Sequence, residues 1–198
     1  MHGFKSLPLH FFIDYFKVSI HVSDLMKKKS LPTPEHFLHR ACELGAIEAK
    51  VISPQHVFTA EWVRRKCQYG CDGFGEHLTC PPYSPTPQET RRLLDEYTTA
   101  LLIHCPTRGV EVLQIISTLE REAFLAGYYK AFGMSAGPCS LCEICNVQKT
   151  CCHTEQARPS MEACGIDVYR TARTAGYPIE VVQDQGCPEN YYGLLLLE

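Results

Sequence analysis

Two short segments hold seven of the chain's twelve cysteines, and this clustering constrains the fold more than any other feature of the sequence. The first group is Cys67, Cys71 and Cys80, and the second is Cys139, Cys142, Cys145 and Cys151. Disulfide frameworks occur mostly in shorter secreted chains and spread their partners along the sequence. Close spacing is typical of thiolates that share a metal. We therefore expect two metal-binding segments in a reducing compartment, the cytoplasm.

The second group follows the pattern Cys-x2-Cys-x2-Cys-x5-Cys from Cys139 to Cys151. Three closely spaced thiolates can wrap one side of a cube of iron and sulfide, and a fourth can close it. Zinc sites more often use two separate Cys-x2-Cys pairs, although four thiolates on one zinc ion stay an alternative. The pattern predicts a 4Fe-4S cluster. Cys152 adjoins Cys151, and either could supply the fourth sulfur.

The first group has the spacing Cys67-x3-Cys71-x8-Cys80 and is interspersed with glycines. Glycines let the backbone approach a metal closely and leave amide hydrogens free to bond to cluster sulfides. We expect a second metal or a second 4Fe-4S cluster here, with a fourth position that is open or filled. The candidates to fill it are His77, Cys164 and Cys187. An open iron would bind substrate or water, whereas a filled one favours electron transfer.

Hydrophobic periodicity separates helical from extended segments. We expect helices at 34–44, 88–97, 109–130 and 166–175, and strands at 46–52, 57–63, 100–105, 131–136, 178–182 and 191–197. The first helix would place Cys42 on its buried face. This order predicts an α+β fold: a layered sheet with helices on it and two cysteine-rich metal-binding insertions.

Charge and hydropathy exclude two classes of partner. The formal net charge of −3 offers no basic face for nucleic acid. The apolar stretch at 7–20 is interrupted by Asp14 and Lys17, so it predicts neither a signal peptide nor a membrane span. A basic run at 27–29 follows it, and we expect residues 1–30 to be an N-terminal extension. Residues 31–198 would then form a single metal-binding α+β domain.

Four blocks of the sequence together resemble a known family. They are Cys67-x3-Cys71 with Cys80-Pro81-Pro82-Tyr83-Ser84-Pro85, Ala136-Gly137-Pro138-Cys139 with Cys142 and Cys145, Ala157-Arg158-Pro159-Ser160-Met161-Glu162-Ala163, and Gly165-Ile166-Asp167-Val168. They resemble the widespread prokaryotic family described as "predicted metal-binding protein", a domain of unknown function, over about residues 30–198. The resemblance implies metal binding of the iron–sulfur kind and an anaerobic or facultative setting.

The same resemblance bears on the last ligand of the second group. In similar sequences the last cysteine is followed by a basic residue, a histidine or aromatic residue, and Pro-Glu. This register implies that Cys151 is the ligand, and it makes Cys152 a departure at the basic position.

The sequence thus predicts an iron–sulfur protein that transfers electrons to a partner enzyme, with one or two 4Fe-4S clusters as its redox groups. One alternative is a metalloenzyme or cofactor-assisting protein with an open iron at Cys67, Cys71 and Cys80. The other is a zinc-stabilised interaction module. No pattern identifies a catalytic residue, so whether the chain is an enzyme stays open.

Overall fold

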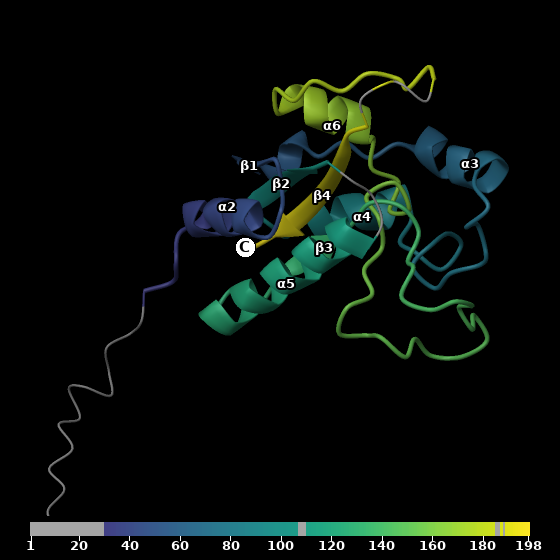
Figure 1. Ribbon diagram of the computed structural model, residues 1–198, viewed down its shortest axis with the longest axis horizontal. Helices are drawn as coiled ribbons and strands as arrows, with labels where there is room; N and C mark the ends of the chain where they lie inside the picture. Colours follow the sequence, from purple (N-terminus) through teal and green to yellow (C-terminus); the bar gives the residue numbers. More distant parts are fainter. Residues whose placement is uncertain (1–29, 107–109, 185–186, 188) are drawn as a thin grey trace, which may run out of the picture. The chain divides into compact units, whose positions relative to one another are not determined.

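The computed structural model describes residues 30–106, 110–184, 187 and 189–198 (Figure 1). Its helices are α2 (Pro34–Glu43), α3 (Glu61–Gly70), α4 (Pro87–Leu94), α5 (Val110–Ala126) and α6 (Val168–Thr174), and its strands are β1 (Glu48–Ile52), β2 (Ala100–Cys105), β3 (Phe132–Met134) and β4 (Tyr191–Leu196). A 3-10 turn, η1 (Pro54–His56), follows β1. The predicted α+β class is confirmed. The predicted extension, residues 1–30, lies outside the described residues apart from Ser30, and that boundary stays a prediction.

The four strands form one antiparallel sheet in the order β1, β2, β4, β3. The two central strands pair along their whole length, from Ala100 opposite Leu196 to Cys105 opposite Tyr191. All six residues of β2 are buried. A strand covered on both faces has an almost continuous apolar sequence instead of an alternating one, which is why 100–105 could be recognised.

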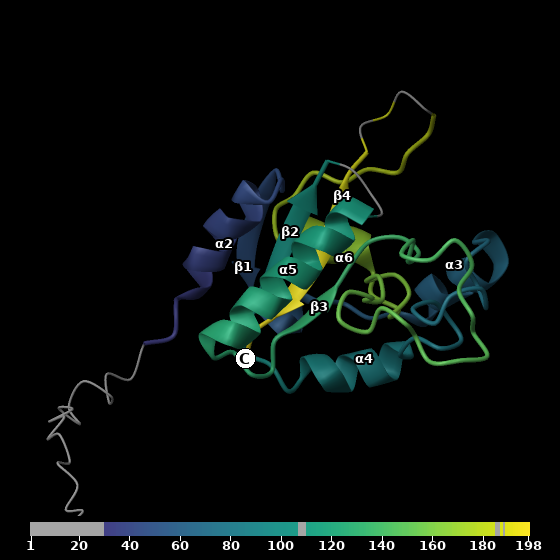
Figure 2. The same cartoon turned by 60° about the horizontal axis from the view of Figure 1, so that its bottom comes forward.

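Both faces of the sheet are covered by apolar clusters. Because successive side chains of a strand point to opposite faces, neighbouring residues of β2 and of β4 belong to different clusters. Leu101 and Leu195 pack in a cluster with buried residues of α2 and α5. Leu102 and Leu194 pack in a second cluster with α4, α6 and the turn that contains Met161. Figure 2 shows α5 lying over the sheet, roughly along the direction of β2 and β4. The turn at Met161 carries part of one cysteine-rich segment, so the second cluster anchors that segment to the sheet.

Helix α5 approaches the sheet closely because two glycines lie beneath Ile116. A Cβ atom on Gly193 of β4 would lie 2.7 Å from the Cδ1 atom of Ile116, and one on Gly133 of β3 would also overlap the Ile116 side chain. The backbone of α5 can therefore lie this close to β3 and β4 only because Gly133 and Gly193 have no side chain.

We expect Gly193→Ala to lower the free energy of unfolding by about 1–3 kcal/mol, the usual cost of overpacking a core. Urea denaturation of the single variant measures this loss. In an Ile116→Ala background the same glycine substitution should cost little, because the side chain that it meets is gone. An equal cost in both backgrounds would show that the close approach is not the cause.

Two of the predicted strands are wrong. The segment 57–63 contains the start of α3, where Val63 is buried and Trp62 is 49% exposed. The segment 178–182 pairs with no strand among the described residues, and Val181 and Val182 are both exposed. Apolar β-branched residues favour strands only where a neighbouring strand is available to pair with them. Among the described residues neither segment pairs with a strand, and Thr59 forms only an isolated bridge with Ile166.

The helix predicted from residue 34 is present, but the position of Cys42 on it is wrong. Phe37 and Ala41 form the buried face, whereas Cys42 is exposed. By contrast, the helix predicted at 88–97 is present as α4 and begins with a capping box. Thr86 accepts a hydrogen bond from the Glu89 N–H group, and the Glu89 carboxylate accepts one from the Thr86 N–H group.

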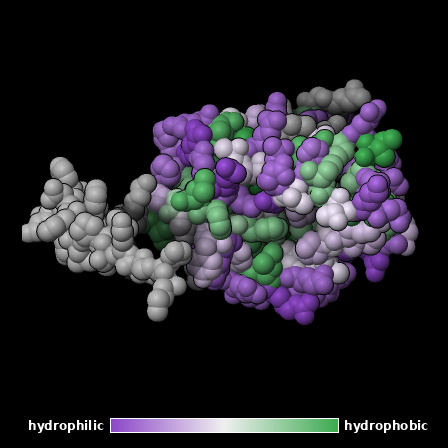
Figure 3. All heavy atoms as spheres, turned by 90° about the horizontal axis from the view of Figure 1, so that it is seen from below, coloured by the Kyte–Doolittle hydropathy of each residue, from purple (hydrophilic) through white to green (hydrophobic). Residues whose placement is uncertain are grey.

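The face of the molecule drawn in Figure 3 mixes hydrophilic and apolar side chains. Two of the most exposed apolar side chains belong to the cysteine-rich segments: Tyr69 is 82% exposed and Ile144 is 85% exposed. No helix in the described ranges combines the length and the apolar character that crossing a membrane requires.

Candidate metal centre

Two irregular segments carry all but one of the predicted ligands. Residues 71–86 join α3 to α4, and residues 135–167 join β3 to α6, without a helix or strand in either described segment. The longer segment is closed at its base: the Ser135 N–H group donates to the Pro159 carbonyl at 2.8 Å, and the Met161 N–H group donates to the Ser135 carbonyl at 2.9 Å. The cysteines between these anchors therefore lie on one closed loop.

The cysteines of the second group surround a small cavity. Its lining includes Cys139, Cys142, Cys145 and Cys151 together with His77 and His153. The volume of the cavity is about 10 Å³, roughly that of one water-sized sphere. The backbone N–H group of His153 donates to Cys151 Sγ at 3.4 Å. Four thiols with a neighbouring imidazole are a donor set that suits an iron–sulfur cluster or zinc.

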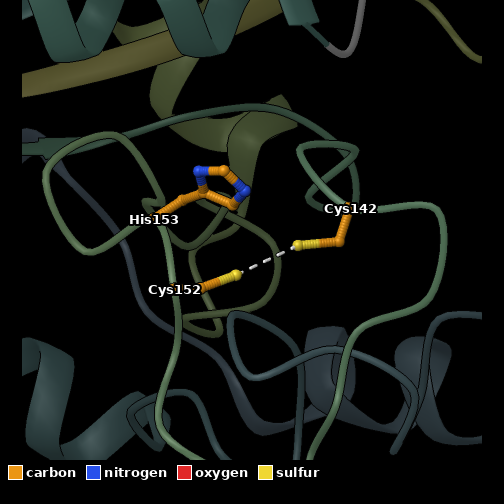
Figure 4. A group of neighbouring side chains, drawn as sticks. All are labelled: Cys142, Cys152 and His153. Carbon is orange, nitrogen blue, oxygen red and sulfur yellow. Dashed lines mark hydrogen bonds between the residues drawn. The ribbon is translucent and has the colours of Figure 1, made fainter.

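Cys152 also reaches this group. Its Sγ atom lies 3.7 Å from Cys142 Sγ, and Figure 4 shows the two sulfur atoms pointing toward each other. Ligand atoms of Cys142, Cys152 and His153 all lie within 4.8 Å of one another. The hydrogen bond between the two thiols raises the pKa of Cys142. Both Cys151 and Cys152 are thus placed as possible fourth ligands, and His153 is a further candidate that the spacing of the cysteines did not predict.

The first group lies around Gly73. A Cβ atom on this glycine would lie 3.6 Å from the sulfur atoms of both Cys71 and Cys80, and the Gly73 N–H group donates to Cys71 Sγ at 3.4 Å. Cys80 is buried, and this burial, followed by the nearby Cys71 thiol, raises the pKa of Cys80 to about 11. Burial also raises the pKa of Cys67, which lies in the last turn of α3. A metal ion that binds here must displace thiol protons.

The two groups of cysteines lie next to each other. The Cβ atom of Pro138, which directly precedes Cys139, would be 3.5 Å from a Cβ atom on Gly73. Thr79, which directly precedes Cys80, lines the cavity of the second group. The sequence separates these groups by almost 60 residues, yet the fold joins them into one region.

The three predicted candidates for the fourth position of the first group have other surroundings. Cys164 is fully buried in the apolar cluster beneath the sheet. Cys187 donates a hydrogen bond to Asp184 Oδ1, with 3.6 Å between the sulfur and oxygen atoms. His77 lines the cavity of the second group. The group is instead approached by Glu162, whose backbone carbonyl accepts a hydrogen bond from Cys67 Sγ at 4.0 Å.

The side chain of Glu162 is unusual for a carboxylate. Its Oε2 atom is buried and has no hydrogen-bond partner within the described part of the chain. Burial raises the pKa of Glu162, and hydrogen bonds from its own N–H group and from the Ser160 hydroxyl group offset only part of this effect. In the sequence, Glu162 stands out only as part of a family block, because no local pattern marks a residue as buried next to a cysteine.

A large cavity lies beside the first group. Its volume is about 1260 Å³, and α3, α6 and residues 179–182 and 189–192 contribute to its walls. Cys67, Cys71 and Glu162 are part of this lining. Sites for small molecules and cofactors commonly enclose about 300–1,000 Å³, so the cavity is large enough for such a ligand. It brings together segments that are far apart in sequence, and local periodicity could not reveal it.

Comparison with known families bears on what these cysteines do. Residues 50–197 match the model of a family described as "Predicted metal-binding protein (DUF2284)". The chain belongs to this family. No curated protein matches the chain, and no solved structure matches it. The DUF2284 match covers both cysteine groups and Glu162, and it confirms the family predicted from the sequence blocks. Membership supports a metal-binding domain for residues that the fold brings into one region.

Proposed function

We propose that the chain is an iron–sulfur protein with two 4Fe-4S clusters, which transfers electrons to a partner enzyme. The observation that supports this most is that the fold brings Cys139, Cys142, Cys145 and Cys151 around one point, with the spacing of a ferredoxin-like run. Cys67, Cys71 and Cys80 would hold the second cluster. A reducing compartment, the cytoplasm, suits a chain whose twelve cysteines are all free.

Electron transfer also needs a route between the clusters and to the partner. The contact region of Gly73 and Pro138 would bring the two clusters close enough for electrons to pass from one to the other. We call the cluster at Cys139, Cys142, Cys145 and Cys151 the outer cluster and the one at Cys67, Cys71 and Cys80 the inner cluster. Ile144 lies between two ligands of the outer cluster and is 85% exposed, so a partner protein can approach that cluster closely. The expected route runs from the partner through the outer cluster to the inner one, or in reverse.

Anaerobic purification followed by iron, sulfide and zinc analysis tests the proposal. We expect about eight irons and eight sulfides per chain, and a broad visible absorbance that dithionite bleaches. Reversible reduction without turnover of a small molecule would agree with electron transfer. Stoichiometric zinc without sulfide, in protein prepared without oxygen, would overturn it.

A second candidate function is a metalloenzyme, or a protein that assists a cofactor, at Cys67, Cys71 and Cys80. The large cavity favours it, because Cys67 and Cys71 form part of its wall and would present a bound metal to a ligand there. Cyanide offers a simple test, since it binds iron only where a coordination position can be exchanged. A change in the spectrum of one cluster would favour the enzyme, and no change in either would favour electron transfer.

One distance favours a third candidate, a zinc-stabilised interaction module. Two thiolates on a tetrahedral zinc ion, with Zn–S bonds of about 2.3 Å, lie about 3.8 Å apart. The sulfur atoms of Cys142 and Cys152 are 3.7 Å apart, and His153 could add an imidazole ligand. Such a protein would be colourless, and a chelator would unfold it.

A further inference from the structure

Glu162 lies where the first group of cysteines borders the large cavity. Its backbone carbonyl contacts Cys67 Sγ, and Glu162, Cys67 and Cys71 line the same cavity. The Oε2 atom is buried and has no hydrogen-bond partner among the described residues. A buried acceptor of this kind costs free energy unless a proton or a cation meets it.

No side-chain cation in the described part of the chain forms an ion pair with Glu162. Burial raises the pKa of Cys67, and the charge of Arg64 offsets part of this rise. The guanidinium group of Arg64, however, already donates hydrogen bonds to backbone carbonyl groups. It donates to the carbonyl oxygens of Pro82, Ser84, Pro85 and Ala163 at 2.8–3.3 Å. When Glu162 is ionised, the cation best placed to balance it is thus a metal bound by the neighbouring cysteines.

We propose that Glu162 is the fourth protein ligand of the metal centre at Cys67, Cys71 and Cys80, bound through the buried Oε2 atom of its side chain. This inference rests on the proposed function, since it requires a metal at that group. It replaces the candidates His77, Cys164 and Cys187, each of which has other surroundings in the structure.

A carboxylate in this position gives the inner metal a different chemistry from the outer one. Iron and zinc are held firmly by soft thiolates, whereas a hard oxygen ligand exchanges more readily. A molecule in the cavity with an oxygen or nitrogen donor could therefore displace Glu162 from the metal. The cavity wall beside it includes the aromatic rings of Trp62, Tyr191 and Tyr192, which suit a flat organic ligand.

Oxidation with ferricyanide tests this ligand set in the anaerobic iron–sulfur protein. Ferricyanide removes one electron from a 4Fe-4S cluster with a weakly held iron, which then leaves as one ferrous ion and converts the cluster to the three-iron form. We expect the unaltered chain to lose about one iron of its eight and to show the electron paramagnetic resonance signal of a three-iron cluster. Glu162→Cys should keep all the irons, because a thiolate now holds the exchangeable one.

Two further variants make the result decisive. Glu162→Gln should lose the iron faster than the unaltered chain, whereas Glu180→Gln, which changes a carboxylate in the same cavity wall, should behave like the unaltered chain. The inference fails if Glu162→Cys and Glu162→Gln both respond to ferricyanide as the unaltered chain does. It also fails if the unaltered chain keeps all its iron.

The outcome stays informative if the proposed function itself is wrong. A chain that carries zinc and no sulfide would end the iron–sulfur proposal, and the ligand set would then be read with cobalt(II) in place of zinc. Glu162→Cys should add one thiolate and raise the thiolate-to-cobalt charge-transfer absorbance of that site by about one third, from three thiolates to four. An unchanged absorbance would overturn the role of Glu162 while leaving the metal site intact.

Discussion

Cys142→Ser is expected to remove about half of the bound iron and sulfide, from about eight of each per chain to about four. Cys142 lines the cavity of the second group and also lies 3.7 Å from Cys152, so it takes part in every arrangement of ligands that the structure allows. A serine hydroxyl is a much poorer ligand for iron than a thiolate, and the remaining cysteines would hold the cluster weakly. Metal and sulfide analysis, with the visible spectrum, measures the loss.

Cys42→Ser is the matched control for this experiment. Cys42 is exposed on α2 and belongs to neither group, so its replacement should leave the iron and sulfide content unchanged. A Cys142→Ser chain with a full complement of iron and sulfide would contradict the assignment of the second group.

The same measurement distinguishes Cys151 from Cys152. Cys151 lines the cavity with the three leading cysteines, so Cys151→Ser should lose iron as Cys142→Ser does, and Cys152→Ser should not. The opposite result would make the pair at 3.7 Å the true ligands. It would also mean that the register implied by the family resemblance does not hold in this chain.

Arg158→Ala is expected to lower the free energy of unfolding by about 3 kcal/mol, the lower end of the range for breaking a buried ion pair. Two guanidinium nitrogens of Arg158 donate to the two oxygens of Glu120 at 2.6 Å, and both side chains are largely buried. Glu120 also accepts a hydrogen bond from the Gly133 N–H group at 2.8 Å. Removing the arginine leaves a carboxylate that is buried without its charge partner, which explains the size of the effect.

The loss should extend to the metal centre. Arg158 also donates to the carbonyl groups of Thr154 and Ala157, so it fixes the end of the cysteine-rich loop to α5. Urea denaturation of the metal-loaded protein measures stability, and the rate of iron loss to a chelator measures the looseness of the loop. We expect both to change in Arg158→Ala.

Arg40→Ala serves as the control for Arg158. Arg40 pairs with Glu122, which lies on α5 two residues after Glu120, but this pair is much more exposed. Exposed ion pairs contribute little to stability because water screens them. Equal effects of the two substitutions would show that burial is not what gives the Arg158 pair its importance.

The helices and strands that were predictable from the sequence are those in which the apolar pattern of the segment alone determines the structure. The apolar run at 100–105 and the long periodic helix at 109–130 correspond to β2 and α5, and the helix predicted at 88–97 corresponds to α4. The segment 178–182 has equally β-prone residues but is no strand, because pairing depends on which neighbour the fold supplies.

The candidate site divides in the same way. The spacing of the cysteines was enough to predict two groups, since ligands of one metal must lie close together along a loop. Three features were not predictable: the contact between the groups, the large cavity, and the position of Glu162. Each depends on how α3, α6 and the turn at 160–166 come together, and no local pattern carries that information.

The position of β4 at the centre of the sheet has a consequence for biosynthesis. β4 lies between β2 and β3, although it is made after both of them and after every cysteine of the two groups. Until β4 has left the ribosome, β2 and β3 lack their shared partner, and each apolar cluster lacks its β4 leucines. The cysteine-rich loops therefore emerge before the surface that anchors them exists. Insertion of metal into a correctly shaped site must wait until translation of this domain is complete.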